Sequence, residues 1–145
     1  MYKHILIATD GSELAGKAVA HGLDLAKTLS AKVTVVTISE PIWSTMPGEM
    51  AIAFPRDEYA KSAAAAVGRI LSAVAEGAKQ KGITVTVKHL ADVFPAEGIV
   101  TAAQEGGCDL IVMASHGRRG LAKLVLGSQA TKVVTNSTVP VLIYR

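Results

Sequence analysis

Short apolar runs alternate along this chain with longer stretches of helical periodicity, and this alternation constrains the fold more than any other feature of the sequence. Runs that are apolar throughout, such as residues 110–114, are typical of strands covered on both faces, as in a parallel sheet. Other runs, such as residues 32–39, are rich in β-branched side chains, which also favour strands. Five strands are predicted, at residues 5–9, 32–39, 83–90, 110–114 and 139–144.

Helical stretches separate these runs. Over residues 57–81 the apolar side chains recur on one face of a helix, and Gly82 suits its C-terminal end. Pro95 suits the first turn of a shorter helix, because proline is tolerated there. Four helices are predicted, at residues 12–30, 57–81, 95–105 and 128–136.

Strands that alternate with helices predict the α/β fold class. We predict a single domain over residues 1–145, built on one doubly wound open sheet of five mainly parallel strands. The predicted strand order is 3-2-1-4-5, with the four helices distributed over both faces. Ligands of such sheets bind beyond the carboxyl ends of the strands, where the strand order reverses.

One irregular stretch, residues 40–55, follows the second predicted strand. It contains three prolines, Trp43 and two methionines, and it shows no sustained periodicity. A connection of this length is more often a lid or a partner surface than a passive linker. We therefore expect it to serve as a lid or as a partner surface.

The charge of the chain argues against nucleic acid as a partner. The net charge is +3, but the fifteen Lys and Arg residues are scattered and aromatic residues make up only 4%. Nucleic-acid surfaces usually concentrate their positive charge and often add stacking aromatics. The one local cluster, Arg118, Arg119 and Lys123, either attracts a small anion such as a nucleotide phosphate or forms a solvated loop.

The remaining composition favours the cytoplasm. No apolar run approaches the ~20 residues that cross a bilayer, and residues 1–7 lack the architecture of a signal peptide. The single cysteine, Cys108, excludes an internal disulfide and suits a reducing compartment. We expect it to be a small structural thiol, and we expect no membrane partner.

The most specific chemical signal is a glycine-containing loop directly after the fourth predicted strand. Ala114-Ser115-His116-Gly117 is followed, nine residues later, by Gly127-Ser128 at the start of the last predicted helix. Gly117 allows a close approach that a Cβ would block. A helix start offers free N–H groups to an anion, and Ser128 could donate to a phosphate or could simply cap the helix.

These residues resemble the glycine-x2-glycine-x9-glycine-serine/threonine motif of the universal stress proteins, which marks their ATP-binding branch. Ala114 stands where that motif has its first glycine. The resemblance covers nearly the whole chain, including residues 8–12, 109–113 and 139–142. It implies a nucleotide-responsive stress module that binds ATP, with Mg or Mn held mainly by the phosphates, and at most slow ATP hydrolysis. It also implies a homodimer formed through residues 139–145.

Carried over position by position, the resemblance assigns Asp10 to the ribose and the main chain of Ile38 to adenine. Ala8 and Thr9 line the same edge. The remaining residues implied around the ribose and phosphates are Met113, Ala114, Gly117, Gly127, Ser128 and Gln129. From the residues alone, Asp10 could accept ribose hydroxyls or could start a capping box with Glu13.

Other patterns are weaker. Residues 11–17 have P-loop spacing, but Ala18 follows where the loop needs Ser or Thr, and Glu13 would repel phosphates. His4, His21 and His89 show no metal-ligand spacing. His116 lies inside the loop, where a phosphate contact is conceivable.

Three rival functions remain open at this point: an ATP or nucleotidyl hydrolase of the same fold, a nucleotide-free dimeric interaction protein, and a flavodoxin-like redox protein. The hydrolase reading lacks an evident base or arginine finger.

Overall fold

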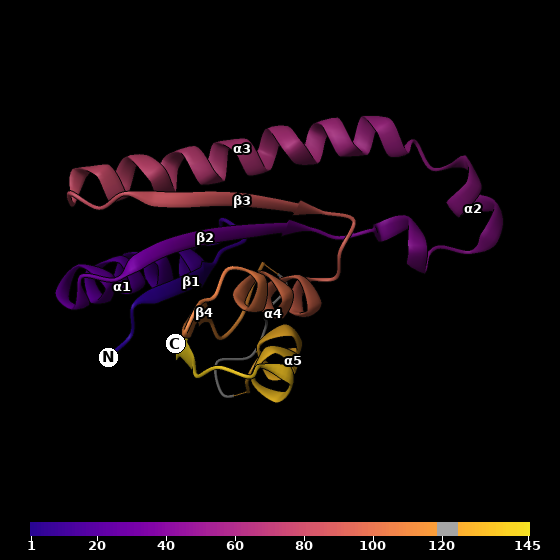
Figure 1. Cartoon of the computed structure of the whole chain (residues 1–145). Coiled ribbons are helices and arrows are strands. Elements are labelled where there is room, and N and C mark those ends of the chain that lie inside the picture. Colours follow the sequence, from indigo (N-terminus) through magenta and orange to yellow (C-terminus); the bar gives the residue numbers. More distant parts are fainter. Residues whose placement is uncertain (119–124) are drawn as a thin grey trace.

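Five strands form one sheet in the order β3-β2-β1-β4-β5, and every neighbouring pair is parallel. The computed structural model describes residues 1–118 and 125–145 (Figure 1). The strands are β1 (His4–Ala8), β2 (Lys32–Ser39), β3 (Val85–Ala91), β4 (Leu110–Ala114) and β5 (Val141–Tyr144). The predicted fold class and strand order are confirmed, with boundaries shifted by one or two residues.

The four predicted helices are present, and the irregular stretch adds further helical structure. The helices are α1 (Glu13–Leu29), α3 (Arg56–Gln80), α4 (Pro95–Glu105) and α5 (Ser128–Asn136), with a 3₁₀ helix η1 (Ile42–Thr45) and a short helix α2 (Gly48–Ala53) between β2 and α3. The expected number of four helices was therefore too low. Pro41, Pro47 and Pro55 stand directly before η1, α2 and α3. A fixed φ suits the start of a helix, so each of these prolines directly precedes a helix, two of them in a stretch that we expected to be irregular.

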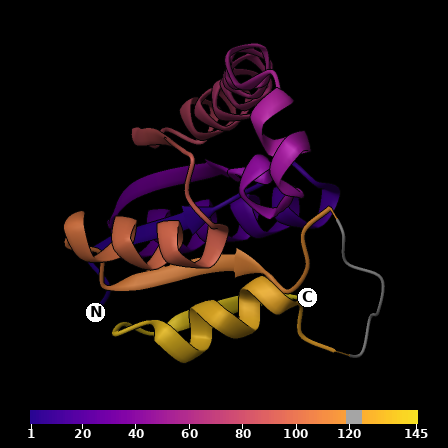
Figure 2. The ribbon, with the colours of Figure 1, turned by 90° about the vertical axis from the view of Figure 1, so that its right-hand side faces the viewer.

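The helices cover the two faces of the sheet in pairs. Buried side chains of α1 and α3 pack with Ile5, Ile7 and Val35 in one cluster. Those of α4 and α5 pack with Leu6 and Ile111 in a second cluster on the opposite face. In Figure 2, α3 lies at the top of the view and α5 at the bottom, with β2 and β4 between them.

Strand lengths leave an opening at the carboxyl edge. Ala8 is the last residue of β1 and pairs with Val36, whereas β2 continues to Ser39 alongside β3. The strand order reverses at β1, whose neighbours are β2 on one side and β4 on the other. The space beyond the end of β1 is thus the expected place for a ligand in a doubly wound sheet.

At the amino ends of the strands, Asp109 links the start of β1 to the start of β4. Its carboxylate accepts hydrogen bonds from the N–H of Lys3 at 2.8 Å and the N–H of His4 at 3.0 Å. Burial alone would raise the pKa of this carboxyl, but the two N–H donors outweigh burial and hold the pKa below its usual value. The ionised carboxylate therefore stabilises the pairing of the β1 start with β4.

We expect Asp109→Asn to lower the free energy of unfolding by about 1 kcal/mol at neutral pH, because the amide loses one acceptor and the charge. The folded pKa is depressed, so the carboxylate's contribution is complete above the unfolded pKa and is lost as the pH falls through the folded one. Urea titrations at pH 7 and at about pH 3 should show the gap between wild type and variant shrinking in acid.

Asp92→Asn is the matched control for this prediction, since Asp92 is exposed and its change should stay within about 0.5 kcal/mol at either pH. The difference in unfolding free energy between the wild type and Asp109→Asn should not be the same at both pH values. If it is, the effect does not come from the ionised carboxylate.

Candidate functional site

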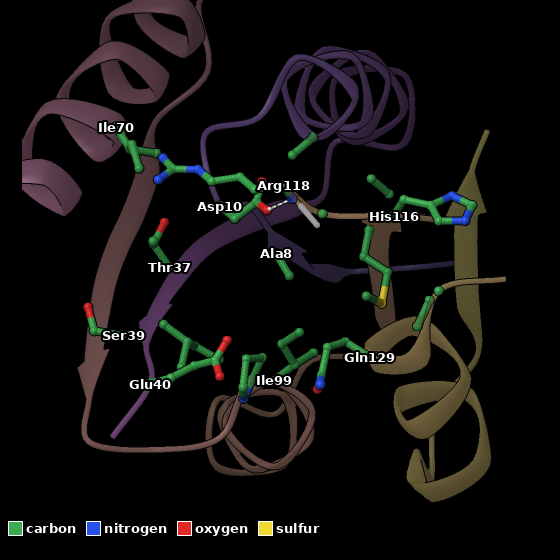
Figure 3. A pocket seen from close by; sticks show the side chains of 18 of the residues that line it. Ala8, Asp10, Thr37, Ser39, Glu40, Ile70, Ile99, His116, Arg118 and Gln129 are labelled. Carbon is green, nitrogen blue, oxygen red and sulfur yellow. Dashed lines mark hydrogen bonds between the residues drawn. The ribbon is translucent and has the colours of Figure 1, made fainter. Parts of the chain in front are cut away.

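A cavity of about 760 Å³ opens beyond the carboxyl ends of β1, β2 and β4. Its walls come from the ends of these strands, from α3 on one side, and from the first turns of α4 and α5 on the other. Figure 3 shows Asp10, Thr37, Ile99 and Gln129 around this common space, each from a different part of the chain. A volume of this size is typical of sites for small molecules and cofactors.

The cavity brings together most of the residues that the sequence singled out. Those that line it are Ala8, Asp10, Ile38, Met113, Ala114, Gly117, Gly127, Ser128 and Gln129. Thr9 does not line it. The N–H of Thr9 donates to Val36 O at 3.0 Å and its hydroxyl accepts from the N–H of Gly11 at 3.2 Å, so Thr9 holds the turn behind the cavity.

Asp10 joins two loops at the cavity wall. Its Oδ1 accepts from the N–H of Ser12 at 2.9 Å, and its Oδ2 accepts from the N–H of Arg118 at 2.8 Å (Figure 3). The capping-box alternative is wrong: the hydroxyl of Ser12 caps α1 by accepting from the N–H of Ala15. Asp10 therefore ties the β1–α1 turn to the loop that follows β4.

The two glycines of the motif are required by close approach. A Cβ at Gly117 would lie 2.6 Å from Asp10 Oδ2, and a Cβ at Gly127 would lie 2.7 Å from the main-chain oxygen of Ser115. That oxygen also accepts from the N–H of Gly127 at 2.9 Å, which brings the two ends of the loop together. Neither glycine has a positive φ, so space and not backbone freedom explains both.

The start of α5 faces the cavity without a side-chain cap. Gly127, and not Ser128, is the N-cap residue, so the capping role considered for Ser128 is wrong. The first N–H bonded within the helix is that of Thr131, to Gly127 O at 2.9 Å. The preceding N–H groups have no partner inside the helix, and with the helix dipole they favour an anion.

Ala114 lines the cavity and also packs against helix α1. Ala114 is buried with Ala15 and Ala18 of α1, in a small cluster that Tyr144 borders. The residue that departs from the family motif thus adds its Cβ to the packing between β4 and α1.

The main chain of Ile38 is open toward the cavity. In a parallel ladder, alternate residues direct their N–H and C=O to opposite neighbouring strands. The C=O of Val36 accepts from Thr9, so the main-chain groups of Ile38, two residues on, point to the same side. Because β1 ends at Ala8, no strand residue meets them there.

Gln129 connects the two helices below the sheet. Its Oε1 accepts from the N–H of Ala96 at 3.2 Å, which satisfies one free donor at the start of α4. The side chain is thereby held at the cavity wall.

Sequence reasoning missed the α3 side of the cavity. This wall includes Thr37 and Ser39 of β2, Glu40, and Tyr59, Ser62 and Ile70 of α3. The hydroxyl of Tyr59 donates to Glu40 O at 3.0 Å, which anchors the start of α3 next to the end of β2. The available signal was the unusual run of hydroxyl side chains on an otherwise apolar strand, Thr34, Thr37 and Ser39.

Trp43, Phe54 and Tyr59 pack together in tilted and edge-to-face contacts, with ring centroids 5.6 to 6.0 Å apart. Arg56 lies over the Trp43 ring at 5.2 Å from its centroid. This aromatic cluster holds η1 and α2 beside the cavity, to which Ile42 contributes.

The weaker patterns do not form sites. Lys17 pairs with Glu13 at 3.4 Å on the exposed side of α1, so the P-loop spacing holds no phosphate pocket. Within residues 1–118 and 125–145, no group of three or more His, Cys, Asp or Glu side chains could hold a metal ion. Arg118 lines the cavity, whereas Arg119 and Lys123 lie outside the described residues.

The histidines and the cysteine have ordinary surroundings. His4 hydrogen-bonds to Thr34 Oγ1 at 2.9 Å and His89 to Ser39 Oγ at 2.7 Å. His116 Nδ1 lies 3.0 Å from Ser115 Oγ. Burial, together with the charge of Asp109, raises the pKa of the Cys108 thiol, as expected for a structural cysteine. No helix in the described part of the chain has the length and apolar character of a membrane span.

Comparison with known proteins connects this geometry to a family. The chain is 32% identical to the universal stress protein YxiE of Bacillus subtilis, over the full length of both. It is 32% identical to the universal stress protein MJ0577 of Methanocaldococcus jannaschii, covering 100% of this chain and 96% of that one. The solved MJ0577 structure superposes with a TM-score of 0.83 at 27% identity, covering 99% and 96% of the two chains.

A solved universal stress protein in complex with cAMP has a TM-score of 0.74 at 27% identity, covering 99% of this chain and 97% of that one. The model of the Universal stress protein family matches residues 1–145. Because the family model matches its full length and a relative is 32% identical over the full length of both chains, this chain belongs to the universal stress protein family.

Proposed function

We propose that this chain binds an adenine nucleotide, ATP foremost, and acts as a nucleotide-responsive module in the stress response. The observation that carries the proposal is the convergence of three different recognition elements on one 760 Å³ cavity. They are the open main chain of Ile38, the carboxylate of Asp10 and the uncapped start of α5.

Each element fits one part of a nucleotide. The N–H and C=O of Ile38 match the donor and acceptor at the edge of adenine. The carboxylate of Asp10 can accept from ribose hydroxyls, since a carboxylate offers more acceptor positions than its two N–H donors use. The free N–H groups at the start of α5 suit the phosphates, and Gly127 lets that start lie close to the end of β4.

Family membership supports the stress-response role, and one relative supports the ligand class. The solved relative in complex with cAMP, at 27% identity, binds an adenine nucleotide within the same overall fold. The Cβ of Ala114 is accommodated by packing with Ala15 and Ala18 of α1, so we propose that this departure from the motif is tolerated.

A divalent ion, Mg or Mn, would be held mainly by the phosphates. The described residues offer no metal cluster of their own, and Asp10 is the acidic side chain nearest the loop glycines. The ion would neutralise phosphate charge without a dedicated protein cage, as is common for Mg²⁺ with nucleotides.

We propose no catalytic residue, and at most slow ATP hydrolysis. The carboxylate of Asp10 is already bound by two N–H groups, and His116 lies within hydrogen-bond distance of Ser115. Phosphoryl transfer requires positioned groups around the γ-phosphate, and the described lining residues supply no evident base for it. Occupancy of the cavity would instead change the surface formed by η1 and α2, since Glu40 and Ile42 line it.

The assembly is a further part of this proposal. We propose that residues 1–145 form a single domain that acts in the cytoplasm as a homodimer through residues 139–145. Strand β5 is an edge strand with half-buried apolar side chains along its length, and such edges recruit another chain. Analytical ultracentrifugation tests this, and a monomer at micromolar concentration would reject the dimer.

Gently purified protein should release adenine nucleotide detectable by mass spectrometry, and the emptied protein should bind ATP by calorimetry. Asp10→Asn should weaken that binding about tenfold, because one charge-assisted contact is lost. Asp24→Asn is the control, since Asp24 pairs with Lys81 on the surface and does not line the cavity.

If the wild type carries no nucleotide and does not bind millimolar ATP, the proposed function falls and the chain is a dimeric interaction protein. Turnover of ATP above roughly one per second would instead favour a hydrolase.

A further inference from the structure

Thr37 carries a hydroxyl that the protein itself does not satisfy. The side chain is only 3% exposed, and among the described residues its Oγ1 is the one buried side-chain oxygen or nitrogen atom without a hydrogen-bond partner. The neighbouring hydroxyls on β2 are both used, Thr34 by His4 and Ser39 by His89. Buried polar groups are normally paired, so an unpaired one calls for a partner from outside the chain.

The position of Thr37 points to that partner. Thr37 lines the cavity and directly precedes Ile38, whose main-chain groups open toward the same space. Figure 3 shows Thr37 on the side of the cavity near Ile70 of α3. The α3 residues that line the cavity are the apolar Ala63, Ala66, Val67 and Ile70 and the polar Tyr59 and Ser62, and none of them hydrogen-bonds to the Thr37 hydroxyl.

Resting on the proposed function, we propose that Thr37 is a base-recognition residue. Its hydroxyl donates to, or accepts from, a polar atom of the purine that Ile38 holds by the main chain. The hydroxyl is shielded in the unliganded chain, but threonine moves its oxygen between staggered positions by a χ1 rotation of about 120°. Binding of the base thus gives the Thr37 hydroxyl a hydrogen-bond partner, which no residue of β2 or α3 provides.

Thr37→Val tests this inference with the smallest change, because valine keeps the branched shape and removes only the hydroxyl. Calorimetry should show ATP affinity about tenfold lower in Thr37→Val and nearly unchanged in Thr37→Ser, which restores the hydroxyl. Thr34→Val is the matched control on the same strand: it loses the bond to His4, so it should lose stability but keep ATP affinity.

A set of altered bases identifies the contacted atom. The probes are purine riboside triphosphate, which lacks the 6-amino group, and the 3-deaza and 7-deaza analogues of ATP, which each lack one ring nitrogen. For the wild type, one of these analogues should bind about tenfold more weakly than ATP. For Thr37→Val, the same analogue and ATP should bind with equal affinity. This coupling would assign the hydroxyl to that atom of the base.

The possible failures are distinct. A wild type that does not bind ATP removes the proposed function, and this inference with it. A wild type that binds, with Thr37→Val within twofold of it, overturns the inference alone. So does a Thr37→Val variant that weakens ATP and every analogue by the same factor, since the hydroxyl would then act on the fold and not on the base. Urea unfolding confirms that the variant is folded, as expected when an unpaired hydroxyl is removed.

Discussion

Gly127→Ala should weaken ATP binding about a hundredfold, which corresponds to about 2.7 kcal/mol of binding free energy. The added Cβ would lie 2.7 Å from Ser115 O. This oxygen belongs to the main chain at the end of β4 and cannot turn aside as a flexible side chain would. The methyl group must therefore push the start of α5 away from β4, and overpacking of this kind typically costs 1–3 kcal/mol.

Binding suffers because the same shift moves the phosphate-binding elements. The hydrogen bond from the N–H of Gly127 to Ser115 O, at 2.9 Å, sets the position of the uncapped N–H groups of α5. Once that bond lengthens, these donors no longer face the cavity that Asp10 and Ile38 share. Calorimetric titration with ATP and urea unfolding should accordingly show both affinity and stability reduced.

Gly16→Ala is the control for this prediction. Gly16 lies within α1, and a Cβ added there would meet nothing within 4 Å. Alanine has the higher helix propensity, so this variant should be more stable by up to about 1 kcal/mol and should bind ATP as the wild type does. Wild-type affinity in Gly127→Ala would mean that the position of the α5 start is unimportant for the ligand.

The fold was predictable because its determinants are local and repetitive. The apolar runs of β1 and β4 and the one-faced periodicity of α3 set the strand and helix order, and right-handed crossovers limit how such a chain can wind. Gly82 adopts a φ of +74° where the sequence predicted the end of α3, and Pro95 begins α4 as predicted.

The stretch between β2 and α3 was less predictable, since its prolines allow two interpretations. Pro47 and Pro55 can break a helix or precede one, and the choice depends on the packing of Trp43, Phe54 and Tyr59. Aromatic contacts between residues separated along the chain are not visible in a local pattern.

The candidate site also has a part that the sequence predicts and a part that it does not. The positions around the loop glycines follow from a motif whose residues are close together in the sequence. The α3 wall could not be predicted, because periodicity tells which face of α3 is buried and not which strand residue it meets. Thr37 was counted only as a β-branched residue that favours a strand, yet its unpaired hydroxyl is visible once its neighbours are known.

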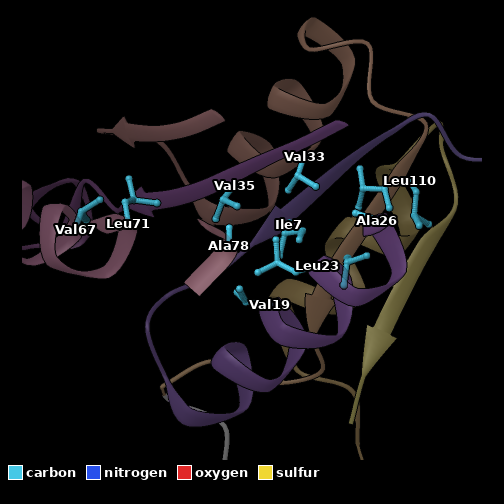
Figure 4. Packing of buried hydrophobic residues seen from close by; sticks show 12 residues of the cluster. Ile7, Val19, Leu23, Ala26, Val33, Val35, Val67, Leu71, Ala78 and Leu110 are labelled. Atoms are coloured by element: carbon cyan, nitrogen blue, oxygen red, sulfur yellow. The ribbon is translucent and has the colours of Figure 1, made fainter. Parts of the chain in front are cut away.

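Ile7→Ala should lower the free energy of unfolding by about 3 to 4 kcal/mol, the largest loss of stability that we predict. Ile7 is fully buried in the central strand β1, between the sheet and α1. Figure 4 shows it close to Leu23 of α1. Truncation of a buried isoleucine loses apolar burial and leaves a cavity, and the rigid sheet can close that cavity only in part.

The packing around Ile7 makes a second variant informative. Helix α1 approaches the sheet at Gly22, where an added Cβ would lie 2.8 Å from Ile7 Cδ1 and 3.3 Å from Val112 Cγ1. Gly22→Ala alone should therefore cost about 1 to 3 kcal/mol through overpacking. In the Ile7→Ala background the Ile7 atoms at 2.8 and 3.2 Å are gone and only the milder contact with Val112 Cγ1 remains, so the same methyl group should fill part of the cavity and should recover stability.

Urea unfolding of the two single variants and the double variant measures this coupling directly. Gly68→Ala is the matched control, since a Cβ at Gly68 on α3 meets nothing within 4 Å and should act alike in both backgrounds. Equal costs of Gly22→Ala with and without Ile7 would contradict the contact. If Gly22→Ala destabilises the wild type but stabilises Ile7→Ala, then Gly22 is what allows α1 to pack close to β1. The end of this strand, Ala8, and the nearby Asp10 line the cavity. The placement of the strand that leads to the candidate site would then depend on a glycine that does not line the cavity.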